Sequence, residues 1–163
     1  MVTYAKPVLL PGAVSISLEP QGELTPFYAD GVKYYVASSN DGYEGDLEVA
    51  LITDGFRLAV FNEVLDTNKV MFETAEGEAK EFALGFQIDG DIKGTRFWFY
   101  NCTATRPTTE SSTTENTKEP TTDKITVSCA ASEDGTVRGK TTAEVAAAIY
   151  DAWFDSVYIK KVV

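Results

Sequence analysis

The chain has 163 residues, of which 44% are hydrophobic and 12% aromatic, which is enough to form the buried core of one domain. Its net charge of −11 argues against a nucleic-acid-binding protein, because such proteins neutralise phosphates with Lys and Arg. The chain contains no histidine, so the commonest general base is missing and the usual His/Cys zinc site cannot be assembled from one chain. We therefore expect a protein that is not an enzyme and needs no cofactor or metal.

Short segments of alternating hydrophobicity predict strands along most of the chain. Val14–Leu18 and Asp46–Leu51 each place aliphatic side chains on one face and polar or small ones on the other. Glu81–Ile88 repeats this pattern, Arg96–Tyr100 is aromatic on both faces, and Lys124–Ala130 alternates once more. The sequence therefore predicts a mainly β fold of the α+β kind.

Two helices are expected between and after these strands. Asp54 can cap a short helix through Phe56–Phe61. Thr141 or Thr142 can cap a second helix from Ala143 to about Phe154, which contains a run of alanines with high helix propensity.

Residues 106–122 form a low-complexity stretch rich in Thr, Glu and Ser, between two strand-like segments. It is nearly free of apolar side chains, so it cannot form a core of its own, and it is long for a hairpin connection. Two interpretations stay open: a disordered surface loop, or an arm that orders against a neighbouring subunit.

Cys102 and Cys129 flank this stretch symmetrically, so they could lie opposite each other if the flanking strands pair. A disulfide is then conceivable, but cytosolic thiols are usually reduced. We expect two free, partly buried cysteines that act as small hydrophobic side chains.

Several segments occur in an order and spacing that together resemble a known family. They are Leu10–Pro20, Thr25–Gly31, Tyr34-Tyr35, Asn40–Tyr43, Gly45–Leu47, Phe86, Asp89–Gly94, Tyr100–Ala104, Arg106-Pro107, Trp153-Phe154 and Val157-Tyr158. The set resembles the major tail protein (tail tube protein) family of long non-contractile tailed phages and prophages of Gram-positive bacteria. The resemblance runs from Tyr4 to Lys160.

The resemblance implies that residues 1–163 are a single tail tube domain, a β-sandwich or barrel with one or two flanking helices. It implies a virion structural protein whose rings, usually hexameric, stack into the conduit that delivers DNA into the host. The implied partners are further copies of the chain, a tape-measure protein, a tail terminator and a distal tail protein, and DNA passes through without specific binding. Family members carry a further strand-like segment before the Tyr4–Pro11 region, so we expect an N-terminus truncated relative to the family.

The same reading assigns three groups of residues. Contacts between stacked rings are expected from the polar arm, through Arg106, Pro107, Thr109, Glu110, Thr114, Glu115, Lys118 and Glu119. The inner wall of the tube is expected from small and polar residues opposite the apolar strand faces, namely Ser15, Ser17, Ala83, Gly85 and Gln87. Subunit interfaces are expected from the aromatic residues Phe27, Tyr28, Tyr34 and Tyr35, which otherwise could stack on a sugar or base.

Localisation is expected to be the virion tail, assembled in the cytoplasm of a bacterial host. The first seven residues lack the basic and long apolar segments of a secretory leader, and no stretch approaches the roughly 20 apolar residues that span a bilayer. Two other classes stay open: a monomeric immunoglobulin-like module that binds a sugar or receptor, and an enzyme that uses carboxylates, although no paired-acid motif stands out. A tube protein of a secretion system is a close structural cousin of the main interpretation.

Overall fold

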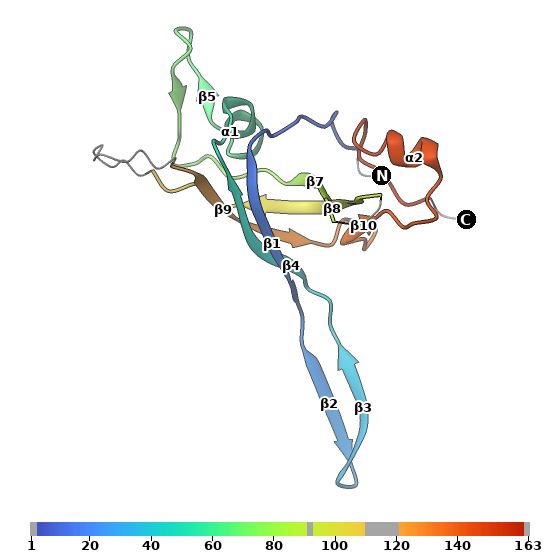
Figure 1. The fold of residues 1–163 in the computed structure, drawn as a ribbon. Coiled ribbons are helices and arrows are strands. Elements are labelled where there is room, and N and C mark those ends of the chain that lie inside the picture. Colours follow the sequence, from blue (N-terminus) through green and yellow to red (C-terminus); the bar gives the residue numbers. More distant parts are fainter. Residues whose placement is uncertain (1–2, 91–92, 110–120, 162–163) are drawn as a thin grey trace, which may run out of the picture.

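The computed structural model describes residues 3–90, 93–109 and 121–161, and it confirms the expected mainly β class (Figure 1). All paired strands run antiparallel. The strands are β1 (Ala13–Gln21), β2 (Leu24–Ala29), β3 (Val32–Ser38), β4 (Gly42–Val49), β5 (Val64–Leu65), β6 (Met71–Phe72), β7 (Phe82–Ile88), β8 (Thr95–Ala104), β9 (Asp123–Ala130) and β10 (Arg138–Lys140). The helices are α1 (Asp54–Val60) and α2 (Ala147–Asp151).

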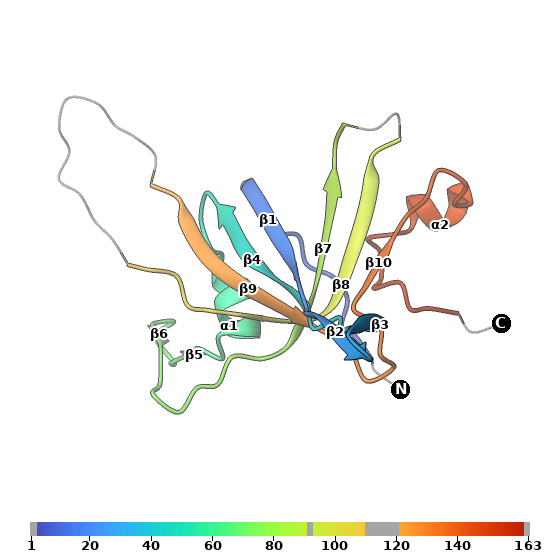
Figure 2. The same ribbon diagram turned by 90° about the horizontal axis from the view of Figure 1, so that it is seen from below.

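Six strands form one sheet in the order β1-β4-β9-β8-β10, with β7 also paired to β8. Because β9 and β10 pair with successive parts of β8, they share one of its edges and leave the other edge to β7. The sheet is strongly curled (Figure 2). The ribbons β2–β3 and β5–β6 leave this body at opposite ends (Figure 1).

The main core lies on one face of the curled sheet, where α1 covers it. Alternate residues of β4 and β9 supply buried side chains, which is why the period-two pattern of these two segments predicted them correctly. β8 contributes Phe99, Cys102 and Ala104 to the same core. The buried set is Leu47, Val49, Ile52, Val60, Phe61, Phe99, Cys102, Ala104, Ile125, Val127 and Cys129.

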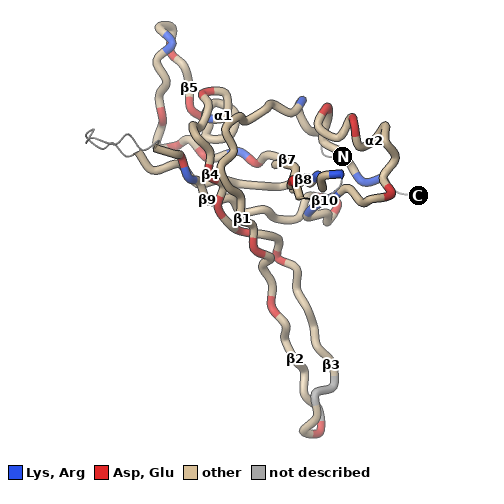
Figure 3. The backbone as a smooth tube through the Cα atoms, in the orientation of Figure 1, with Lys and Arg blue, Asp and Glu red and all other residues tan. Residues whose placement is uncertain are grey.

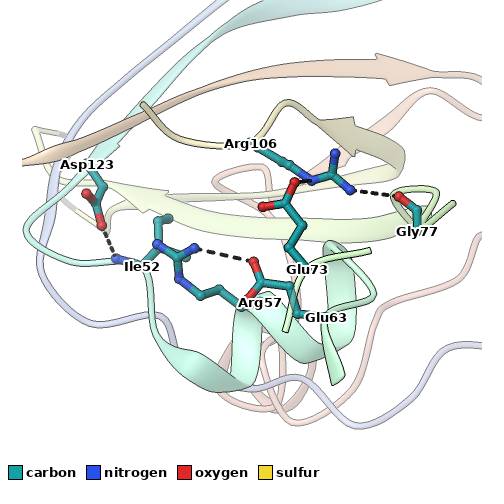
Figure 4. Close-up of polar contacts among 7 residues, drawn as sticks. All are labelled: Ile52, Arg57, Glu63, Glu73, Gly77, Arg106 and Asp123. Carbon is teal, nitrogen blue, oxygen red and sulfur yellow. Dashed lines mark hydrogen bonds and ion pairs between the residues drawn. The ribbon is translucent and has the colours of Figure 1, made fainter. Parts of the chain in front are cut away.

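The start of α1 corrects one expectation. The residue at the N-cap is Thr53 and not Asp54: the Thr53 hydroxyl oxygen accepts a hydrogen bond from the Phe56 N–H at 3.3 Å. Asp54 occupies the first turn, where a negative charge is favourable. The preceding backbone is fixed by the Asp123 carboxylate, which accepts a bond from the Ile52 N–H at 2.7 Å (Figure 4).

A second, smaller core lies on the opposite face of β8. Trp98 and Tyr100 pack there against Trp153 and other residues of the C-terminal segment that contains α2. The Trp98 indole N–H donates to the Trp153 carbonyl at 3.0 Å, and the Tyr100 hydroxyl donates to the Tyr158 carbonyl at 2.7 Å. The chain from α2 onwards is therefore held on the body.

The second helix is shorter than predicted. It begins after Ala146, which makes no side-chain cap, and neither Thr141 nor Thr142 caps it. Thr141 instead extends the ladder beyond β10: its hydroxyl oxygen accepts from the Arg96 N–H at 3.0 Å, and its own N–H donates to the Arg96 carbonyl at 2.9 Å. Because the Thr141 hydroxyl oxygen is engaged by the Arg96 N–H, it does not cap a helix, and the helix starts downstream.

The two cysteines are free and lie opposite each other in the β8–β9 ladder, as the symmetry of the sequence suggested. Both are buried completely rather than partly, and their sulfur atoms are 2.8 Å apart. The hydrogen bond from the Cys102 thiol to Cys129, together with burial, raises the pKa of Cys102. The pair therefore acts as apolar core, in agreement with the prediction.

We expect Gly85→Val to destabilise the fold, because a Cβ atom at this position would lie 2.5 Å from the Trp98 ring. Overpacking of this kind typically costs about 1–3 kcal/mol of unfolding free energy, measurable by urea denaturation. The control is Gly55→Ala in α1, where an added Cβ meets nothing within 4 Å. Equal stability of both variants would contradict the close packing of Trp98 on β7.

Candidate assembly surfaces

The β2–β3 hairpin projects far from the body of the molecule (Figure 1). Its two-residue turn, Asp30-Gly31, has positive φ at both positions (52° and 76°), as the turn that suits a twisted antiparallel hairpin requires. Pro26 has no backbone N–H, and it is tolerated here because β2 has only one partner strand. The sequence thus favours an isolated ribbon at this place.

This hairpin carries large apolar side chains in contact with solvent. Phe27 and Tyr35 are paired directly across it, with stacked rings whose centroids lie 5.0 Å apart. They are 50% and 55% exposed, and Tyr28 is 61% exposed. The side chain of Tyr34 lies outside the described part of the structure. Leu24, Val32 and Val36 add further exposed apolar surface.

At the base of the hairpin, β2 follows directly on β1 and β3 leads back into β4. The Ser39 hydroxyl oxygen accepts from the Glu23 N–H at 2.9 Å, and the Ser39 N–H donates to the Glu23 carbonyl at 3.0 Å. The Asp41 N–H donates to the Gln21 carbonyl at 3.0 Å. These bonds keep the two sides of the ribbon paired between the sheet and the hairpin.

A second surface is the sheet face opposite the main core, over β1, β4 and β9, which we call the acidic face. It carries Ser15, Ser17, Glu44, Asp46, Glu48, Lys124 and Thr126. The Glu48 carboxylate accepts from the Thr122 hydroxyl at 2.6 Å and from the Ser15 hydroxyl at 3.3 Å. Acidic positions are spread over the body and both ribbons, so this face belongs to a generally acidic surface (Figure 3).

Asp46 lies at the centre of the acidic face. Its carboxylate forms an ion pair with the Lys124 ammonium at 2.9 Å and accepts from the Thr126 hydroxyl at 3.1 Å. These hydrogen bonds, first from Lys124 and then from Thr126, lower the pKa of Asp46. The Asp46 carboxylate therefore keeps its charge, and its contact with Lys124, to a lower pH than an isolated aspartate would.

The five residues expected to line a channel divide into two groups. Ser15 and Ser17 are exposed on the acidic face. Ala83 and Gly85 are half-buried, because Ala83 packs against the C-terminal core and Trp98 lies over Gly85, so the structure corrects the expectation that they face an open space. Gln87 is exposed but engaged: its side-chain oxygen accepts from the Arg96 Nε–H at 2.8 Å.

The structure describes only part of the polar arm. Glu110, Thr114, Glu115, Lys118 and Glu119 lie outside the described residues, whereas Arg106, Pro107 and Thr109 lie within them. Arg106 is engaged in its own subunit, where it pairs with the Glu73 carboxylate at 3.1 Å and donates to the Gly77 carbonyl at 2.8 Å (Figure 4). Its role here is to hold the loop after β6.

Within the described part of the chain, three strands of the sheet, β1, β7 and the short β10, each have an edge without a strand partner; β10 pairs only with β8. β1 pairs only with β4, and β7 pairs only with β8. In the same ranges, no helix is long and apolar enough to cross a membrane, and no group of three or more His, Cys, Asp or Glu residues is placed to hold a metal ion.

Comparison of the chain with protein-family models, with curated proteins and with solved structures finds no match in any of the three.

We expect Asp46→Asn to lower the melting temperature slightly at pH 7. Because the pKa of Asp46 is lower in the folded state than its ordinary value of 3.8, the ionised carboxylate stabilises the fold at pH values above 3.8. This stabilisation is lost as the pH falls through the pKa of the folded state. The difference from wild type should therefore vanish in strong acid, as measured by circular dichroism melts at both pH values.

Glu44→Gln is the control for Asp46→Asn, because it removes the same charge from the same strand at a residue without a described ion pair. If both variants change the melting temperature equally, the Lys124–Asp46 contact contributes nothing.

Proposed function

We propose that this chain is a structural subunit that assembles with copies of itself into a hollow tube, and that this tube is the tail tube of a long non-contractile tailed phage or prophage. In this proposal, the subunits form closed rings, and the rings stack into the conduit for DNA. The tape-measure, terminator and distal tail proteins are the further partners that the family resemblance suggests, and the virion tail is the proposed location.

The observation that carries the proposal is the exposed apolar hairpin. A two-stranded ribbon alone is at best marginally stable in water, because it has no interior in which to bury its side chains. Contiguous exposed apolar surface on a soluble protein marks an interaction site. Phe27 and Tyr35 are about half covered already, so burying the rest against another copy would contribute about 1 kcal/mol each, which makes this hairpin a source of assembly energy.

The free edges of β1 and β7 support ring formation. An exposed edge presents unpaired N–H and C=O groups that pair readily with another strand. If β1 of one copy meets β7 of the next, the contact is heterologous, and a constant rotation closes it into a ring. The six-stranded sheets then continue from one subunit to the next.

The acidic face supports the role of a conduit. In a closed ring one face of the continued sheet is directed inwards, and the face opposite the main core carries Ser15, Ser17, Asp46 and Glu48. A negatively charged wall repels the phosphate backbone, so DNA passes without being held. Ala83 and Gly85 are covered within the subunit and are not part of this proposed wall.

We expect Phe27→Ser combined with Tyr35→Ser to raise the concentration needed for assembly at least tenfold. Two apolar side chains are lost from the contact, and each factor of ten corresponds to about 1.4 kcal/mol. Negative-stain electron microscopy over a concentration series measures the effect. The melting temperature of the unassembled subunit should stay near wild type, because the hairpin lies outside both cores.

Thr25→Ser on the same hairpin is the control and should assemble like wild type. Normal tubes from the Phe27/Tyr35 variant would contradict the role of the hairpin. A wild-type chain that stays monomeric but binds a sugar or receptor would favour the binding-module alternative, and assembly with secretion-system components would favour a tube of that kind.

A further inference from the structure

A groove runs along β10 and the C-terminal segment, on the side of the molecule that carries α2 (Figures 1 and 2). It measures about 580 Å³, and its lining includes four basic residues, Arg138, Lys140, Lys160 and Lys161. Glu144 is the only acidic residue in the lining. We call this feature the basic groove.

Such a concentration of positive charge is unusual in this chain, which has 14 basic residues and a net charge of −11. All four basic side chains of the groove are exposed, and none forms an ion pair with a described residue. Arg138 lies over the Tyr43 ring at 5.0 Å, and Lys160 also borders the smaller neighbouring pocket that contains Glu133 and Asp134. Because Arg138 is engaged with Tyr43, the charges of the groove that are available to an anionic ligand are those of Lys140, Lys160 and Lys161.

Trp153 forms part of the wall of the groove and is 3% exposed. Its buried indole N–H has no hydrogen-bond acceptor among the described residues. This N–H is covered within the subunit, so the basic side chains alone give the groove its preference for an anionic ligand.

A loop with acidic side chains, which could bind a basic surface, lies on the side of the molecule opposite the basic groove. The loop after β6, residues 73–78, contains Glu73, Glu76 and Glu78. Arg106 binds Glu73 and the Gly77 carbonyl and so fixes the loop (Figure 4), while Glu76 and Glu78 are exposed and form no ion pair with a described residue. Both ribbon views place this loop across the body from α2 and β10.

We propose that the basic groove of one copy receives the Glu76–Glu78 loop of the next copy. The two surfaces differ and lie on opposite sides, so the contact is head-to-tail and repeats around a ring. Opposite charges give this contact its register and its selectivity. The inference rests on the proposed self-assembly and names a lateral contact in it, separate from the apolar hairpin.

Charge reversal tests the contact. We expect Lys140→Glu with Lys160→Glu to prevent ring formation, and Glu76→Lys with Glu78→Lys to do the same, because each variant places like charges in the contact. An equimolar mixture should form rings again, since each loop then meets a groove of opposite sign in alternating copies. Sedimentation velocity and negative-stain microscopy measure rings in all samples.

Lys6→Glu with Lys69→Glu is the matched control, because it makes the same change in net charge outside the groove. It should form rings like wild type. Rings from either charge-reversed variant alone, or their absence from the mixture, would overturn this contact while leaving the proposed function standing. A wild-type chain that stays monomeric at every concentration would overturn both.

Discussion

The stacked rings of Phe27 and Tyr35 lie on a ribbon that projects away from the rest of the molecule and has no interior of its own. Exposing this much apolar surface is unfavourable in water, whereas covering it with another molecule is favourable. The hydrogen bonds around Ser39 keep the two sides of the ribbon paired where it leaves the sheet. The exposed apolar surface of the hairpin is therefore the main support for the proposed self-assembly.

The body supplies a rigid base for that ribbon. One sheet carries a core on each side: α1 covers the first, and the C-terminal segment covers the second through Trp98 and Trp153. What remains uncovered on the sheet is polar and acidic, around Asp46. The division of the sheet into covered apolar areas and an uncovered acidic area is compatible with the proposed subunit of a water-filled conduit.

The sequence predicted those elements whose side chains alternate between core and solvent. β1, β4, β7 and β9 alternate in the sequence, so their period of two was visible, whereas β8 is buried on both faces and was predicted from its aromatic run. β2 and β3 are apolar on both faces and gave no such period. The Asp30-Gly31 turn was the available signal for that hairpin. The covering of Gly85 by Trp98 and the pairing of Arg106 with Glu73 depend on distant segments, so local pattern could not reveal them.

Amide hydrogen exchange over residues 24–38, measured on the same protein at low and high concentration, tests the burial of the hairpin most directly. Both samples should show equal protection in β8 and β9, which lie in the body. We expect the hairpin amides to exchange markedly more slowly at high concentration, because a second copy covers them. Equal, fast exchange of the hairpin at both concentrations, with assemblies present at the higher one, would contradict the account.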